Sequence, residues 1–102
     1  MIDDGLRFSS PIVAPERVEQ AKEQAEPKWK VTVYNNETNT YDEVITILMI
    51  ATGCSLDDAY IEAWEIDHYG QCIVHSADEP ECIGVADVIA TIGINVEATP
   101  DN

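Results

Sequence analysis

Hydrophobic and polar positions alternate over residues 29–34, WKVTVY, where three of the six residues are β-branched. This period of two is typical of a β-strand with one buried face. Two later apolar runs, QCIVH at 71–75 and INVEA at 94–98, predict two more strands.

The segments between these strands have apolar residues at helical spacing, and we expect helices over about residues 40–53, 55–67 and 80–93. Asn39 or Thr40 can cap the first of them. The expected buried positions are Val44, Ile47, Leu48 and Ala51 in the first helix, Leu56, Ala59, Ala63 and Ile66 in the second, and Val85, Val88, Ile89 and Ile92 in the third.

The resulting order, β-α-α-β-α-β, predicts an α+β fold: a single small domain with a three-stranded antiparallel sheet packed against helices. Residues 1–28 contain three prolines and a polar run without a continuous apolar stripe, so we expect a flexible N-terminal extension. The domain is expected over residues 29–98, followed by a polar tail at 99–102.

Charge is distributed unevenly along the 102 residues, whose formal net charge is −15. Beyond residue 28 the single Lys or Arg is Lys30. Such an anionic surface repels phosphate backbones and anionic lipids, so we expect no nucleic-acid partner and no membrane partner. Three cysteines without a CxxC pair suit free thiols in a reducing compartment, and no stretch of eighteen apolar residues occurs. We therefore expect a cytoplasmic protein, and a monomer.

Catalytic motifs are missing from the sequence, which has no Gly-rich phosphate loop, nucleophile elbow or HExxH. A metal site could be drawn from Cys72, His75, His68 and Asp67, but residues 72 and 75 of a strand should point to opposite faces. No sequence feature places a base beside any thiol. We expect no metal, no cofactor and no enzyme activity, and a cysteine hydrolase or metalloprotein is the distant alternative.

The connection between the first strand and the first helix is unusually polar, reading NNETNT at residues 35–40. Amide, carboxylate and hydroxyl oxygens gathered in one loop could accept hydrogen bonds from an ammonium group. A plain loop that ends in a helix cap would use the same residue types. The candidate binding residues of this loop are Asn35, Asn36, Glu37, Asn39 and Thr40.

Two segments make residues 28–98 resemble the ClpS family of bacterial Clp protease adaptors: KVTVYNNETNTYDEV at 30–44 and AWEIDHYGQCIV at 63–74. The resemblance implies an adaptor that binds a free N-terminal large hydrophobic residue (Phe, Tyr, Trp or Leu) of N-degron proteins. It also implies delivery to a ClpA- or ClpC-type AAA+ unfoldase through the N-domain of the unfoldase, with the extension at 1–28 entering its pore. The third helix lacks the basic residue that many relatives use for docking.

The resemblance also assigns roles to single residues. Asn35 and Glu37 would hold the α-amino group and first peptide unit of the substrate, while Asn36 stands where the family usually has an acid. Asn39 or Thr40 takes the place of the family's hydroxyl, and Asp67 replaces a histidine. The pocket for the first side chain would be lined by Tyr41, Val44, Ala63, Ile66 and Ile94.

The changes at Asn36 and Asp67 leave a second hypothesis open. The chain could be a ClpS-like interaction domain, or a regulator of the unfoldase, that does not read N-termini.

Overall fold

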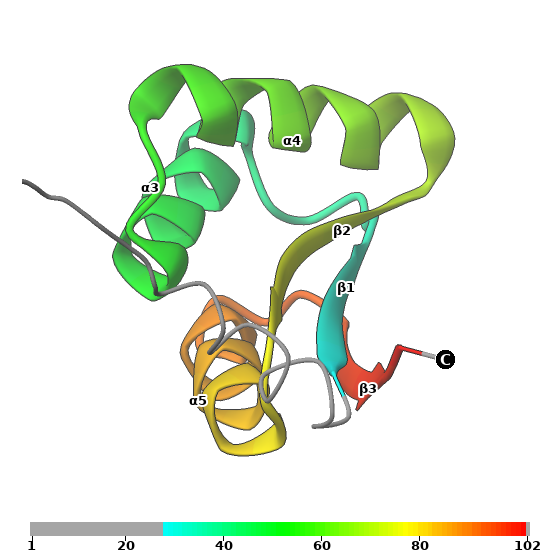
Figure 1. Cartoon of the computed structure of the whole chain (residues 1–102). Helices are drawn as coiled ribbons and strands as arrows, with labels where there is room; N and C mark the ends of the chain where they lie inside the picture. Colours follow the sequence, from blue (N-terminus) through cyan, green and yellow to red (C-terminus); the bar gives the residue numbers. More distant parts are fainter. Residues whose placement is uncertain (1–27, 102) are drawn as a thin grey trace, which may run out of the picture.

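The structure of the protein is a computed structural model, and it describes residues 28–101 (Figure 1). The expectation for the extension at 1–27 lies outside these residues. The elements follow in the predicted order β-α-α-β-α-β, which confirms the fold class. They are β1 (Trp29–Tyr34), α3 (Tyr41–Thr52), α4 (Leu56–Tyr69), β2 (Gln71–Ala77), α5 (Glu79–Ala90) and β3 (Val96–Pro100).

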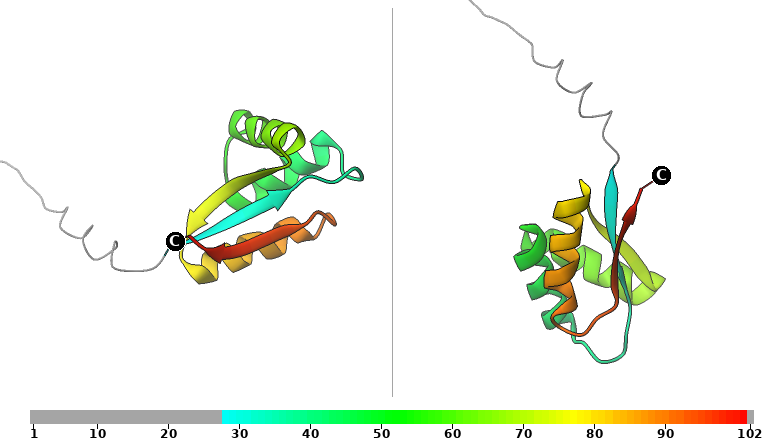
Figure 2. Two further views of the ribbon diagram at one scale, coloured as in Figure 1. Left: turned by 90° about the vertical axis from the view of Figure 1, so that its right-hand side faces the viewer. Right: turned by 90° about the horizontal axis from the view of Figure 1, so that it is seen from below.

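The three strands form one antiparallel sheet in the order β2-β1-β3, as predicted. Figure 2 shows α3 and α5 on one face of this sheet, and Figure 1 shows α4 above the end where β1 finishes and β2 begins. Val31 and Val33 of the central strand are fully buried beneath the helices. The alternation of WKVTVY therefore marked the face of the sheet that forms the core.

One prediction about the sheet was wrong. The pairing of β1 with β2 shifts between Val31 and Thr32, so that Val31 lies opposite His75 while Val33 lies opposite Cys72. Directly opposed residues of antiparallel strands share a face of the sheet. The extra residue in β2 therefore puts Cys72 and His75 on the same face, because a β-bulge interrupts the simple alternation.

The helix boundaries follow from local capping chemistry. Thr40 is the cap of α3, where its hydroxyl accepts from the Glu43 amide and the Glu43 side chain accepts from the Thr40 amide. Ser55 caps α4 with its hydroxyl, which accepts from the Asp58 amide, and this helix ends at Gly70 in the left-handed region (φ 90°). The Gly70 carbonyl accepts a hydrogen bond from the Asn35 amide at 2.9 Å, so the end of α4 lies beside the end of β1.

The C-terminal boundaries differ from the expected ones. Helix α5 ends at Ala90 rather than at residue 93, because Thr91 to Gly93 form a turn closed by backbone bonds to Val88, Ile89 and Ala90. Strand β3 begins at Val96 and continues to Pro100, since Thr99 and Pro100 still pair with β1.

The core lies between the sheet and the helices. Its buried members include Val31, Val33, Val44, Ile47, Leu48, Ala59, Ala63, Ile66, Val85, Ile89 and Ile94. Leu56 was predicted to be buried, but 58% of its surface is exposed. None of the helices within residues 28–101 is long and apolar enough to cross a membrane.

Candidate functional site

The polar loop after β1 is held in shape by its own amide side chains. The Asn36 Oδ1 accepts hydrogen bonds from the backbone amides of Thr38 (3.3 Å) and Asn39 (3.1 Å). Its Nδ2 donates to the Asn39 Oδ1 at 2.8 Å. This turn, in which an Asn side chain replaces a backbone acceptor, explains why two asparagines stand three residues apart.

Asn39 then ties the loop to two neighbouring elements. Its Nδ2 donates to the Glu43 Oε1 at 3.0 Å and to the carbonyl of Ile92, in the turn after α5, at 2.9 Å. These hydrogen bonds to Glu43, first from Asn39 and then from the Thr40 backbone, hold the pKa of the Glu43 carboxyl below its usual value. At the start of the loop, the Asn35 amide donates to the Gly70 carbonyl at 2.9 Å. The loop is thus fastened to α3, α4 and α5.

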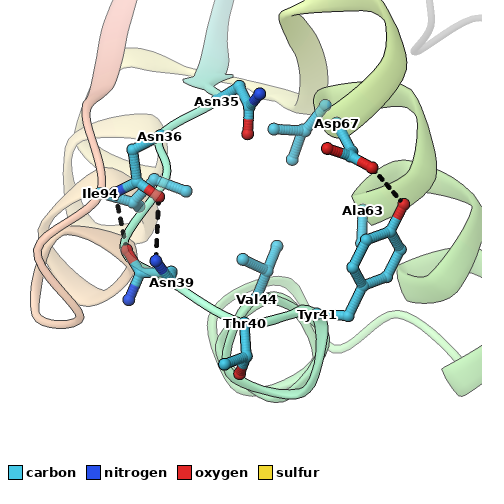
Figure 3. A pocket seen from close by; sticks show the side chains of 10 residues that line it. Asn35, Asn36, Asn39, Thr40, Tyr41, Val44, Ala63, Asp67 and Ile94 are labelled. Carbon is cyan, nitrogen blue, oxygen red and sulfur yellow. Dashed lines mark hydrogen bonds between the residues drawn. The ribbon is translucent and has the colours of Figure 1, made fainter.

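A cavity of about 140 Å³ lies between this loop, the first turns of α3 and the C-terminal half of α4 (Figure 3). Its lining residues are Asn35, Asn36, Asn39, Thr40, Tyr41, Val44, Ala63, Ile66, Asp67 and Ile94. The four aliphatic members are buried and form an apolar wall. A cavity of about 150 Å³ suffices to hold a benzene molecule, so this one matches a single large side chain.

The opening of the cavity carries polar groups. Figure 3 shows the Asn35 amide and the Asp67 carboxylate both on the side of the cavity across from Thr40. Tyr41, the first residue of α3, closes another side because its hydroxyl donates to the Asp67 Oδ2 at 2.9 Å. Burial, followed by this hydrogen bond to Asp67, raises the pKa of the Tyr41 hydroxyl, which therefore remains a donor at neutral pH.

Asp67 is the one acidic residue among the lining residues, and no Lys or Arg is among them. The two lysines of residues 28–101 are Lys28 and Lys30, and the Lys30 ammonium lies 3.9 Å from the Asp101 carboxylate at the other end of β1. The site therefore joins an apolar chamber to a mouth that offers hydrogen-bond acceptors and one negative charge. A primary ammonium next to a large apolar side chain has the complementary chemistry.

The structure brings ten of the eleven predicted site residues to this cavity. Glu37 is the exception: its side chain is exposed on the loop, and it does not line the cavity. Of the two candidates for the cap, Thr40 caps the helix and Asn39 braces the loop.

Tyr60 of α4 was not predicted to belong to the site. Its ring lies 6.2 Å from the Tyr41 ring and supports the Tyr41 side of the cavity. The sequence contains one indication of this role. Tyr60 lies four residues after Leu56 and four before Trp64, a spacing that aligns side chains along one side of a helix.

Among the described residues, no hydrogen bond joins a cysteine thiol to a histidine ring. The Cys72 thiol donates to the Glu65 Oε1 at 3.2 Å, and burial together with this carboxylate raises the pKa of Cys72 to about 12. The His75 Nε2 lies 2.7 Å from the Glu81 Oε2, within hydrogen-bonding distance. A protonated thiol is a poor nucleophile and a poor metal ligand. In the part of the chain described by the structure, no group of three or more His, Cys, Asp or Glu side chains is placed to hold a metal ion.

Comparison with known proteins adds a family and a fold. Residues 24–92 match the family model of the ATP-dependent Clp protease adaptor protein ClpS. No curated protein matches the chain. A solved structure of Agrobacterium tumefaciens ClpS2 bound to L-phenylalaninamide is similar, with a TM-score of 0.70 and 15% sequence identity, over 74% of this chain and 98% of that one.

Proposed function

The chain belongs to the ClpS family of ATP-dependent Clp protease adaptors, and from this premise we propose that its cavity captures the free N-terminus of polypeptides that begin with Phe, Tyr, Trp or Leu. The observation that carries the proposal is the combination of an apolar chamber of about 140 Å³ with the Asp67 carboxylate at its mouth. The L-phenylalaninamide bound to Agrobacterium ClpS2 has the two groups that such a site requires, an aromatic side chain and a free α-amino group.

The side chain of the first substrate residue would enter the chamber between Val44, Ala63, Ile66 and Ile94. Burial of a large apolar side chain contributes roughly 1.5–3 kcal/mol. A pocket closed by aliphatic residues would discriminate by size, at roughly 1–3 kcal/mol per methylene. We therefore expect Phe, Tyr, Trp and Leu to be preferred over Ala, and over charged residues, whose burial is unfavourable.

We assign the α-amino group of the substrate to the Asn35 amide oxygen and the Asp67 carboxylate. Asp67 takes the role for which Glu37 was a candidate, because Asp67 lines the cavity and Glu37 does not. A hydrogen bond to a charged group contributes about 1.5–3 kcal/mol. We give a different role to Asn36, Asn39 and Thr40, which shape the loop rather than contact the substrate. Their side chains already form hydrogen bonds to one another or to the start of α3.

The partner of a Clp adaptor is a Clp AAA+ protease, and we propose that this chain delivers its captured substrate to a ClpA- or ClpC-type unfoldase. Helix α5 presents no Lys or Arg to the N-domain of the unfoldase, and Asp87 and Glu81 make its surface acidic. Docking through α5 would therefore need a basic partner surface. Removal of residues 1–27 should leave capture intact and stop delivery, which tests the role given to this segment.

Fluorescence-anisotropy titration of short labelled peptides tests the capture. The peptides differ only at the first residue, which is Phe, Tyr, Trp, Leu, Val, Arg or Ala, and N-acetyl-Phe serves as the control. Binding of the large apolar set that is lost on acetylation would support the proposal. Equal binding of free and acetylated peptides would contradict the proposal, because the opening of the cavity would then not bind the α-ammonium group.

The alternative function is that of a ClpS-like interaction domain, or a regulator of the unfoldase, that does not read N-termini. The hydrogen bonds that occupy Asn36 and Asn39 favour it, since a loop built only to cap α3 would use them in the same way. This alternative predicts that the chain binds the N-domain of the unfoldase and none of the peptides.

A further inference from the structure

Helix α4 has an exposed apolar row on its outer side. Leu56, Tyr60 and Trp64 are 58%, 53% and 38% exposed, and they follow one another at intervals of four residues. This spacing aligns their side chains along one side of the helix. The row continues to His68, whose ring stacks on the Trp64 ring at 4.0 Å. An aligned set of large exposed apolar side chains is a common mark of a binding surface.

The α4 row, defined as Leu56, Tyr60 and Trp64, approaches the wall of the cavity at Tyr60, its middle member. The Tyr60 ring lies 6.2 Å from the ring of Tyr41, which lines the cavity and donates to Asp67. A shallow hollow beside Leu56 and Tyr60 extends this surface along the helix. A chain that leaves the cavity past Tyr41 would therefore meet the row at Tyr60.

We propose that the α4 row binds the residues that follow the captured N-terminal residue, with a preference for apolar or aromatic side chains. The inference rests on the proposed function and deepens it. Tyr60 and Trp64 are separated by about 6 Å along the helix, which an extended chain covers with about two residues. The ring-to-ring distance from Tyr41 to Tyr60 corresponds to about two further residues. Tyr60 would therefore meet roughly the third residue of the substrate, and Trp64 roughly the fifth.

Charge favours a substrate chain over a second copy of this protein. Asp57 and Asp67 lie on the same helix as the row, and the whole chain has a formal net charge of −15. Two copies that met on this surface would bring like charges together. A substrate segment in which Lys or Arg accompanies apolar residues would meet a complementary surface, whereas acidic substrate residues would be repelled.

The test uses the full-length chain and two labelled peptides that share Phe at position one: Phe-Gly-Leu-Gly-Leu-Lys and Phe-Gly-Ser-Gly-Ser-Lys. Phenylalaninamide serves as a competitor that fills the cavity without reaching the row. We expect the leucine peptide to bind about three- to tenfold more tightly. The ratio of the two affinities should fall below about twofold in Tyr60→Ser and in Trp64→Ser.

Ile50→Ser is the matched control, because Ile50 of α3 is 66% exposed and outside the row. It should keep the ratio of the wild type. Equal affinities in the wild type, or a ratio unchanged in both row variants, would overturn the inference. If phenylalaninamide competes while the ratio of affinities is one, the α4 row does not bind substrate, but capture in the cavity is supported. If neither phenylalaninamide nor any peptide binds, both the role of the row and the proposed capture are contradicted. A dimer in sedimentation that Trp64→Ser abolishes would assign the row to a second copy instead.

Discussion

The Tyr41 hydroxyl donates a hydrogen bond of 2.9 Å to the Asp67 carboxylate, and this contact joins the first residue of α3 to the last turns of α4. It holds the one carboxylate of the cavity at its mouth (Figure 3). The hydrogen bond occupies one lone pair of Oδ2 and leaves the other acceptor positions of the carboxylate for a ligand. Asp67 can therefore be oriented by Tyr41 and receive an ammonium group at the same time.

The charge of Asp67 should matter more for capture than its hydrogen bond to Tyr41. Asp67→Asn keeps the shape of the side chain and removes the charge, so we expect the affinity for Phe peptides with a free N-terminus to fall by about tenfold or more. Tyr41→Phe keeps the aromatic wall and removes only the hydrogen bond, so its effect should be several times smaller. Anisotropy titration of both variants measures the difference.

Asp87→Asn is the control for this comparison, because it removes an equal charge from the exposed surface of α5. A loss in Asp87→Asn as large as the one in Asp67→Asn would mean that the overall field, and not the mouth of the cavity, attracts the ligand.

The width of the chamber should set which first residues are accepted. Ala63 is 3% exposed and lines the cavity, so Ala63→Met would place its longer side chain in the space meant for the substrate. We expect the affinity for Phe and Trp peptides to fall by at least tenfold, with a change in the free energy of unfolding of less than about 1.5 kcal/mol because the cavity receives the added atoms. Titration combined with thermal denaturation checks both parts. Unchanged binding of Phe and Trp peptides would place the side-chain pocket elsewhere.

Much of this architecture could be predicted because its signals are local. The alternation in β1, the apolar stripes of α3 and α5, and the capping sequences of α3 and α4 depend on neighbours within a few residues. The cavity was harder to predict from local signals. Its polar loop could be recognised as a cluster of unusual composition, whereas the residues of its apolar wall were predicted only from the resemblance to a family. Val44, Ala63 and Ile66 look like ordinary core positions in the sequence.

The features that escaped prediction depend on the tertiary structure. The bulge opposite Val31 changes which residues of β2 share a face, and no residue type in QCIVH marks it. Leu56 has the spacing of a buried position, yet it is the first residue of α4 and 58% of its surface is exposed. Glu37 was grouped with its neighbours by composition, whereas the turn made by Asn36 and Asn39 leaves it outside the cavity.

The loop should lose its shape when Asn39 is truncated. Asn39→Ala removes the hydrogen bonds to Asn36, Glu43 and the Ile92 carbonyl, some of which are partly buried. We expect the free energy of unfolding to fall by about 1–3 kcal/mol and the affinity for free N-termini to fall as well. Chemical denaturation gives the first quantity, and peptide titration at a temperature where the variant is folded gives the second.

Thr38→Ala is the matched control in the same loop, because the only hydrogen bond of Thr38 found within residues 28–101 uses its backbone amide. It should leave both quantities nearly unchanged. If Asn39→Ala is equally harmless, the side-chain bonds of the loop do not shape the site.

The stability of the domain should fall as the pH rises toward neutrality, because of Glu62. Its Oε1 is buried without a hydrogen-bond partner in the described part of the chain. Burial first, and then the charges of Asp58 and Glu65, raise the pKa of Glu62 from 4.5 to about 7. Between these two values the folded protein keeps a proton that the unfolded chain has released, so the free energy of unfolding decreases with rising pH. Stability from this group is complete below about pH 4.5 and lost above about pH 7.

Glu62→Gln isolates this effect, since it has the shape of the protonated acid at every pH. Glu62 is only partly buried, so solvent screening reduces the effect to about 1–2 kcal/mol. Urea denaturation at pH 4, 5, 6, 7 and 8 should show the variant more stable than the wild type at pH 8 and equally stable at pH 4. Glu79→Gln, which changes an exposed carboxyl at the start of α5, should follow the pH profile of the wild type. A Glu62→Gln profile parallel to that of the wild type would mean that Glu62 titrates normally and that its carboxyl is hydrated in solution.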